Sequence, residues 1–288
     1  MKPNCEDRIF GCLLAGAIGD ALGARFENQE SFQFSIPVDL RITDDTQLTL
    51  ATCEAIVDQG KVEPEAIASQ MANWFSRRRI TGIGSSTLKA LTELNAGGHW
   101  AMVGATGERS AGNGAAMRIS PLAFFLNPDV KLDRQKIRDV ATITHRNDEA
   151  YLGALAVIRV IRADVLDRGV IEMLIEKLPD SRMRDRFIEI QKCDLDSKRL
   201  SEKHSPSGYV VDSVPFSVLS AIEFDDFMTS VQRIVESGGD TDTTGAIFGN
   251  IVGSFYGAGI LPIDVAKKID ELPVIKQMAT NLFRITDN

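Results

Sequence analysis

Two short segments, far apart in the chain, each combine closely spaced carboxylates with hydroxyl groups. Residues 43–46 read Thr-Asp-Asp-Thr, and residues 238–243 read Gly-Gly-Asp-Thr-Asp-Thr. Carboxylate and hydroxyl oxygens without a His or Cys cluster are hard ligands that suit Mg²⁺ or Mn²⁺ rather than Zn²⁺. The spacing lacks the features of an EF-hand, so a calcium-sensor loop is not indicated. Each segment alone also reads as a helix N-terminus, because Thr and Asp accept hydrogen bonds from free N–H groups. Together they predict a metal site if the two loops converge.

Three further polar positions could take part in chemistry. Glu27 could act as a general acid or base, although a single Glu in a loop usually faces solvent. Residues 110–118 (SAGNGAAMR) could form a tight turn or a loop that holds phosphate, and Arg118 within them could be a buried guanidinium paired with a carboxylate. His145 lies between two predicted helices, either as a structural hydrogen-bonding residue or as part of a site. The pattern alone leaves these alternatives open.

The elements that must position these residues are predicted to be helices. Apolar residues recur at spacings of three and four along most of the chain, and the best strand candidate, residues 209–211, is very short. The pattern therefore predicts an all-α protein, with a polar surface loop at 194–208. The predicted helices include one marked by Ile9, one marked by Leu48, one from Pro64, one from Ser85, and the spans 134–144, 148–163, 170–177, 181–192, 214–223, 226–236 and 243–258.

Two of these helices carry stripes of small residues at every fourth position. The stripes are Gly11, Ala15, Gly19 and Gly23, and Gly245, Gly249, Gly253 and Gly257. Each glycine inside a helix costs about 1 kcal/mol of stability relative to alanine. A stripe of glycines is therefore expected to serve helix packing. We expect the two stripes to face one another in a tight central pair, because smooth surfaces let two backbones approach closely. The alternative is that each helix packs separately against bulky neighbours.

Charge and composition restrict the class of partner. The 288-residue chain has 32 Lys and Arg against 40 Asp and Glu, a net charge of −8, which counts against nucleic-acid polymers because phosphate contacts need clustered basic residues. Four scattered cysteines fit a reduced, cytoplasmic setting. The uncharged stretch 243–263 contains five glycines and is not expected to span a membrane. We expect one domain, residues 1–288, whose oligomeric state is open and for which a monomer is the simplest case.

Five motifs in order carry a family resemblance that covers roughly residues 9–259. They are GDALGARFE, TDDT, GNGAAMRISPLA, THRNDEA and GGDTDTTGAIFGNIVG. In this order and spacing they closely resemble the ADP-ribosylglycohydrolase family, the group that includes dinitrogenase reductase-activating glycohydrolase. The resemblance implies a compact orthogonal helical bundle with two Mg²⁺ or Mn²⁺ ions at the base of a cleft.

The resemblance also implies roles for individual residues. The implied metal ligands are Thr43, Asp44, Asp45, Asp240, Asp242 and Thr243. Glu27 matches an acidic residue beside the metals that transfers a proton or gates the site. The implied substrate-binding residues are Ser110, Gly112 and Asn113 for the diphosphate, His145 for the ribose side, and, by a looser match, Gly82 and Gly84 around the distal ribose. Arg25 and Ala111 depart from the family pattern, which leaves acceptor and nucleotide preference open.

The implied reaction is hydrolysis of the bond between ADP-ribose and an acceptor, such as an arginine or serine side chain of an ADP-ribosylated protein. Two other functions stay possible. One is hydrolysis of small ADP-ribose conjugates or other nucleoside-type glycosides. The other is a non-catalytic role, either ADP-ribose binding or structural, since a protein can keep a fold without the catalytic activity of its relatives. The complete set of acidic residues favours an enzyme over a binding module.

Overall fold

The computed structural model describes residues 3–27, 29 and 33–286, and this part of the chain is built almost wholly from helices. Its α-helices are α1 (Cys5–Phe26), α2 (Asp44–Gln59), α3 (Pro64–Ser76), α4 (Ser85–Asn95), α5 (Lys131–Thr142), α6 (Asp148–Arg162), α7 (Gly169–Lys177), α8 (Arg182–Cys193), α9 (Ser197–Lys203), α10 (Val210–Ile222), α11 (Phe227–Glu236), α12 (Thr241–Tyr256), α13 (Ile263–Ala266) and α14 (Leu272–Thr286). Two two-residue strands, β1 (Ala105–Thr106) and β2 (His145–Arg146), pair in parallel. The short 3₁₀ helices are η1 (Glu108–Ser110), η2 (Asn113–Ala115), η3 (Ser120–Phe124) and η4 (Ala258–Ile260). The all-α class predicted from the sequence is confirmed.

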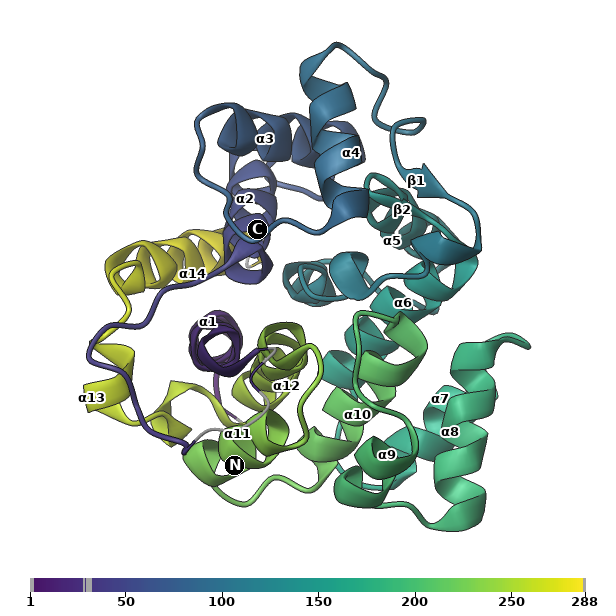
Figure 1. Cartoon of the computed structure of the whole chain (residues 1–288). Coiled ribbons are helices and arrows are strands. Elements are labelled where there is room, and N and C mark those ends of the chain that lie inside the picture. Colours follow the sequence, from purple (N-terminus) through teal and green to yellow (C-terminus); the bar gives the residue numbers. More distant parts are fainter. Residues whose placement is uncertain (1–2, 28, 30–32, 287–288) are drawn as a thin grey trace.

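Helices α1 and α12 pack backbone to backbone at the centre of the molecule, where both are seen side by side (Figure 1). The helices are antiparallel, because Gly11 lies against Gly253 whereas Gly19 lies against Gly245. A methyl group built on Gly245 would lie 2.5 Å from the carbonyl oxygen of Gly19, closer than real side-chain carbons come. Only residues with little or no side chain permit this approach. The predicted face-to-face contact of the two stripes is therefore confirmed.

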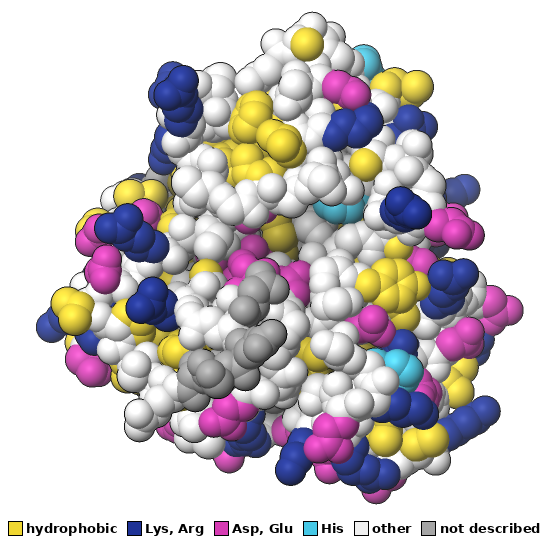
Figure 2. Space-filling model, in the orientation of Figure 1, with side chains coloured by type: hydrophobic (Ala, Val, Ile, Leu, Met, Phe, Trp, Pro, Cys, Tyr) yellow, Lys and Arg dark blue, Asp and Glu magenta, His cyan; other side chains and the backbone are white. Residues whose placement is uncertain are grey.

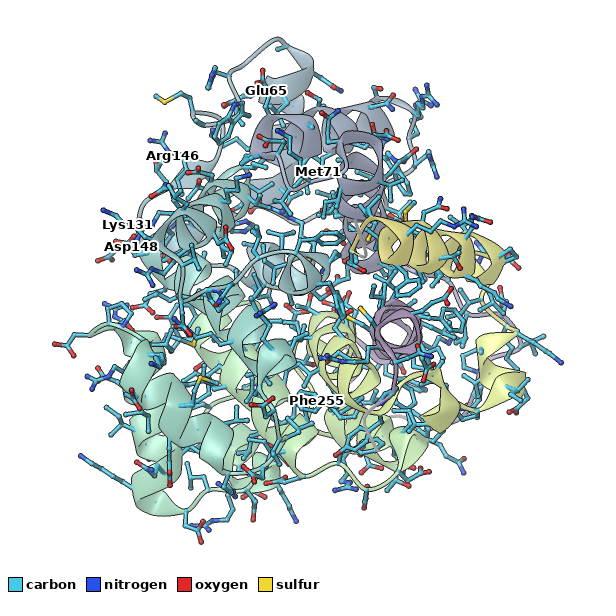
Figure 3. The ribbon with its side chains drawn as sticks, turned by 180° about the vertical axis from the view of Figure 1, so that it is seen from behind. Glu65, Met71, Lys131, Arg146, Asp148 and Phe255 are labelled. Atoms are coloured by element: carbon cyan, nitrogen blue, oxygen red, sulfur yellow. The ribbon has the colours of Figure 1, made fainter. Side chains whose placement is uncertain are left out.

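The other helices surround this central pair. Helices α2, α3 and α4 lie together at the top of Figure 1, and α7 to α11 lie at the bottom. Seen from behind, α1 lies between α12 and α14 (Figure 3). One continuous hydrophobic core runs through the described residues, from Ile9 in α1 to Leu282 in α14. The described residues thus form one compact domain.

Two predictions about the segment before α10 are wrong. The stretch predicted as a surface loop contains α9, whose first N–H groups are capped by Asp196, which accepts a 2.7 Å hydrogen bond from the N–H of Arg199. The predicted strand at 209–211 is the beginning of α10, which includes Pro215 and begins four residues before the predicted start. Tertiary pairing fixes this start, because the N–H of Val210 donates to the carbonyl of Ala111 at 3.0 Å.

One described helix, α1, is long and apolar enough to cross a membrane, and 83% of that window is buried inside the protein. A core helix of a soluble protein passes the same test, and α1 is the helix that packs against α12. The uncharged stretch 243–263 lies mainly in α12 and in the short helix η4 that follows it. Helix α12 has 16 residues, fewer than the roughly 20 that a span needs.

Candidate active site

The two acidic segments converge at the C-terminal end of α1, an arrangement that the sequence pattern had left open. The hydroxyl of Thr241, at the start of α12, donates to the carbonyl of Gly23 on α1 at 2.8 Å. The segment that opens α2 is attached to the same helix through Asp20. Because α1 holds both segments, the N-termini of α2 and α12 are placed beside each other.

Asp20 is the residue that fastens the first acidic segment. Its carboxylate is fully buried and accepts hydrogen bonds from both the N–H and the hydroxyl of Thr43, the latter at 2.7 Å. It also accepts from the N–H of Thr46 at 3.2 Å and from its hydroxyl at 2.5 Å. Burial raises the pKa of Asp20 to about 6, although these four donors act in the opposite direction. Asp20 therefore fixes the loop from which Asp44 and Asp45 project.

The carboxylates themselves gather within a few ångströms. Carboxylate oxygens of Glu27, Asp240 and Asp242 lie within 4.8 Å of one another. Asp240 accepts a 2.8 Å hydrogen bond from the side-chain amide of Asn113, which orients it. Asp45 is buried, and its Oδ1 has no hydrogen-bond partner among the described residues. A buried carboxylate oxygen without a donor is unfavourable by itself and is well suited to a cation.

The raised pKa values of the clustered carboxyl groups also favour a bound cation. Burial, followed by repulsion from Asp20, raises the pKa of Asp44 to about 8. Burial and then the charge of Asp242 raise the pKa of Asp45 well above its usual range, and burial together with Asp240 raises that of Asp242 to about 9. Such repulsion is relieved by divalent cations, and an all-oxygen donor set is what Mg²⁺ and Mn²⁺ prefer. The residues present therefore fit a hard divalent metal centre.

The cluster forms the floor of a cavity of about 320 Å³. In the face shown in Figure 2, acidic side chains lie at the bottom of a central hollow. The lining residues are Glu27, Asp44, Asp45, Gly84, Ser85, Ser86, Thr87, Arg109, Gly112, Asn113, Gly114, Met117, His145, Gly208, Asp240, Asp242 and Thr243. The cavity thus has an acidic floor and a wall that offers hydrogen-bond donors.

The donor wall is made by three elements. The N-terminus of α4 reaches the cavity, and because its N-cap is Gly84, no side chain caps its first N–H groups. Arg109 is the one Lys or Arg among the described residues that line the cavity. His145, at the start of β2, is almost fully buried, and burial together with the charge of Arg118 lowers its pKa to about 3. His145 is therefore neutral at physiological pH, and the anion-binding capacity of the wall lies in Arg109 and α4.

Ten of the predicted site residues line the cavity and three do not. Thr43 lies behind the floor, with its hydroxyl 2.7 Å from Oδ1 of Asp20 and 3.3 Å from Oδ2 of Asp45. Gly82 lies beside Asp44, since a methyl group built on it would be 3.3 Å from Oδ1 of that residue. Ser110 is buried, and its hydroxyl donates to the carbonyl of Thr106 at 2.8 Å. The roles of all thirteen residues stay predictions.

The two departures from the family pattern also lie outside the cavity lining. Arg25 is exposed and faces a separate groove, lined among others by Pro37 and Arg41. Ala111 is buried, and its carbonyl accepts the hydrogen bond that begins α10. Neither side chain is placed to contact a molecule on the acidic floor.

Sequence reasoning missed several residues of the site. The role of Asp20 was not predicted, although a carboxylate within an otherwise apolar helix is a usable signal. Arg109 and the hydroxyl residues at the start of α4, Ser85 to Thr87, were not singled out as site residues. Their signal was weaker, since a single Arg and a Ser-Ser-Thr helix start are common on protein surfaces.

Similar sequences are found among known proteins. The family model described as ADP-ribosylglycohydrolase matches residues 1–288. The chain is 26% identical to the ADP-ribosyl-[dinitrogen reductase] glycohydrolase of Rhodospirillum rubrum over 294 residues, which cover 93% of this chain and 92% of the relative. It is also 26% identical to the ADP-ribosylarginine hydrolase Tri1 of Pseudomonas putida, with 96% of this chain and 78% of the relative covered.

A solved structure supports the fold. A chain described as an ADP-ribosylglycohydrolase-related protein complex superposes with a TM-score of 0.72 at 24% identity, and the match covers 98% of both chains.

Proposed function

The chain belongs to the ADP-ribosylglycohydrolase family, and from this premise we propose that it hydrolyses the glycosidic bond between ADP-ribose and an arginine side chain of a modified protein. The family and the named relatives support a hydrolase of ADP-ribose linkages. The main observation behind the proposal is that one cavity combines an acidic floor with a wall of hydrogen-bond donors.

We propose two divalent cations, Mg²⁺ or Mn²⁺, as the cofactors. The residues that would hold them are Thr43, Asp44, Asp45, Asp240, Asp242 and Thr243. When bound, such ions would supply positive charge that polarises substrate oxygens and lowers the pKa of water. The support is the partnerless oxygen of Asp45 and the raised pKa values of Asp44 and Asp242.

Glu27 is the proposed proton-transfer residue. It is exposed at the end of α1, and its carboxylate lies close to those of Asp240 and Asp242. In hydrolysis, the oxygen of water forms a bond to the anomeric carbon while the bond from that carbon to the acceptor nitrogen breaks. Glu27 would accept the proton from water and return it to the leaving nitrogen, so that the carboxylate is regenerated. The carboxylates around it would stabilise the positive charge that develops on the sugar.

The donor wall is the proposed site for the diphosphate. The guanidinium of Arg109 and the free N–H groups at the start of α4 can each donate to phosphate oxygens. Gly112 and Asn113 belong to the same wall, and Asn113 is already held by Asp240. This arrangement would direct the ribose end of the substrate toward the acidic floor.

Arginine is the acceptor that the electrostatics favour over serine. The exposed carboxylate of Glu27 lines the cavity, and the chain carries a net charge of −8. A guanidinium leaving group is cationic and would be attracted to this carboxylate, whereas a serine hydroxyl is neutral. One named relative is an ADP-ribosylarginine hydrolase, which agrees with this choice.

The test is a panel of three substrates: a peptide ADP-ribosylated on arginine, the same peptide design modified on serine, and free ADP-ribose conjugates. Each is incubated with Mg²⁺, with Mn²⁺ and with a chelator, and released ADP-ribose is quantified by chromatography. We expect fastest release from the arginine peptide, and none in chelator. Preferred release from serine would overturn the acceptor assignment, and release unaffected by chelator would overturn the cofactor assignment.

A further inference from the structure

Arg118 is a fully buried arginine that the proposed reaction does not use. The sequence suggested pairing with a carboxylate, but no described carboxylate is within ion-pair distance of it. Its Nη2 instead donates to the carbonyl of Val140 at 3.2 Å and to the hydroxyl oxygen of Thr144 at 2.8 Å. A buried guanidinium without a counter-charge is unfavourable, so its contact with Thr144 calls for an explanation.

Thr144 connects this guanidinium to the cavity wall. It is fully buried, and its Oγ1 lies 2.8 Å from Nδ1 of His145. A guanidinium can only donate, so Oγ1 accepts from Arg118 and keeps its own proton for another acceptor. Among the described residues, the one further hydrogen-bond partner of this hydroxyl is Nδ1 of His145.

The direction of the second hydrogen bond decides the tautomer of His145. If Nδ1 carried the proton, the hydroxyl of Thr144 would receive two donors and its own proton would be buried without an acceptor. If Nδ1 is unprotonated, it accepts the hydroxyl proton of Thr144, while Oγ1 of Thr144 accepts from Nη2 of Arg118. A neutral ring then carries its proton on Nε2.

Nε2 lies at the cavity. A methyl group built on Gly112 would lie 3.0 Å from Nε2, and one built on Gly114 would lie 2.7 Å from Cε1 of the same ring. The glycines thus make room for the ring edge, which lines the cavity together with Thr87. Nε2 makes no hydrogen bond within the described part of the chain, so its proton is available to a ligand.

We propose that Arg118 and Thr144 are positioning residues that hold His145 in the tautomer protonated on Nε2, so that the ring donates a hydrogen bond to a substrate oxygen and does not act as a base. The part of this proposal that concerns the substrate rests on the proposed function, whereas the tautomer does not. The lowered pKa of His145 agrees with a neutral ring.

The test reads the tautomer directly by long-range ¹H–¹⁵N NMR of the full-length protein at neutral pH. The chain has only three histidines, His99, His145 and His204, so assignment through His145→Gln is practical. The variant Thr144→Val removes the hydroxyl at nearly constant side-chain volume, whereas the variant Thr144→Ser keeps a hydroxyl at this position. A matched control is Thr142→Val, because the hydroxyl of Thr142 donates to the carbonyl of Asp139 and not to a histidine.

We expect Nδ1 of His145 to resonate far downfield of Nε2 in the native protein, in Thr144→Ser and in Thr142→Val, and this pattern to be lost in Thr144→Val. Calorimetric titration with ADP-ribose should show affinity for Thr144→Val reduced about three- to tenfold, the effect of one hydrogen bond. A native protein protonated on Nδ1, or an unchanged spectrum in Thr144→Val, would overturn the proposal. If the tautomer is as expected and ADP-ribose does not bind, the proposed function fails and the tautomer assignment stands.

Discussion

Replacing Asp44 by Asn should stabilise the metal-free protein. Asp44 is 6% exposed, and its pKa is raised from 3.8 to about 8 by burial and by neighbouring carboxylates. Between pH 3.8 and 7 the unfolded chain releases a proton that the folded protein keeps, which lowers stability by about 4 kcal/mol at about 1.4 kcal/mol per pH unit. Asn keeps the shape without this penalty. We expect a gain of about 4 kcal/mol at pH 7, or about 7 °C in Tm.

The pH dependence has a defined sign. A carboxylate with a raised pKa in the folded state destabilises the protein increasingly as pH rises above 3.8, and the effect levels off above about 8. The advantage of Asp44→Asn should therefore be larger at pH 8 than at pH 5. Excess Mg²⁺ should narrow the difference, because ligand at 100 times its Kd stabilises the native protein by about 2.7 kcal/mol and the variant has lost a carboxylate ligand.

The assay is thermal unfolding followed by far-UV circular dichroism, at pH 5 and pH 8, in chelator and in excess Mg²⁺. A matched control is Asp58→Asn, an exposed carboxylate in the same helix, which should change stability by less than about 0.5 kcal/mol. The reasoning is refuted if Asp44→Asn in chelator at pH 8 is no more stable than the native protein, or if its advantage is the same at both pH values.

Three other substitutions, one of them with a matched control, give separate expectations. The variant Glu27→Gln should bind ADP-ribose within about threefold of the native affinity, as measured by calorimetry. Its kcat should fall about 100-fold or more. Full activity would contradict the proposed role of Glu27 in proton transfer. The variant Arg109→Gln should bind ADP-ribose about three- to tenfold more weakly, and its affinity should depend less on salt concentration. An unchanged salt dependence would contradict the proposed contact between Arg109 and the diphosphate. Gly249→Ala should lower the free energy of unfolding by about 1–3 kcal/mol, because the new methyl group would lie 2.8 Å from the backbone nitrogen of Gly16. Gly259→Ala, with no described atom within 4 Å of the new methyl group, should unfold at the native temperature.

The features predicted well from the sequence are those that depend on local pattern. Helix periodicity and the repeat of small residues fixed the central pair, because a stripe such as Gly245, Gly249 and Gly253 has few other uses in a helix. The convergence of the two acidic segments was left open by the sequence, which showed only that each stands at the start of a predicted helix. By contrast, α14 was not predicted, although Ile275, Ala279 and Leu282 have helical spacing and are buried.

The features that were missed depend on tertiary contacts. The start of α10 is set by pairing between Val210 and Ala111, which lie far apart in the sequence. Asp20 has its role because the chain returns to place Thr43 and Thr46 against it. Arg118 lies within a recognised motif, yet its contact with Thr144 requires the fold to bring the segment between η2 and η3 against the segment between α5 and β2. Contacts between residues far apart in the sequence cannot be inferred from residue spacing alone.

The most direct test of the central claim is release of ADP-ribose from an arginine-modified peptide by the native protein and by the double variant Asp240→Ala, Asp242→Ala, with Mg²⁺ binding measured on the same samples. If the acidic floor is a divalent metal centre that hydrolyses ADP-ribose linkages, the native protein binds Mg²⁺ and releases ADP-ribose, and the folded double variant does neither. Undiminished release by the double variant would contradict the account.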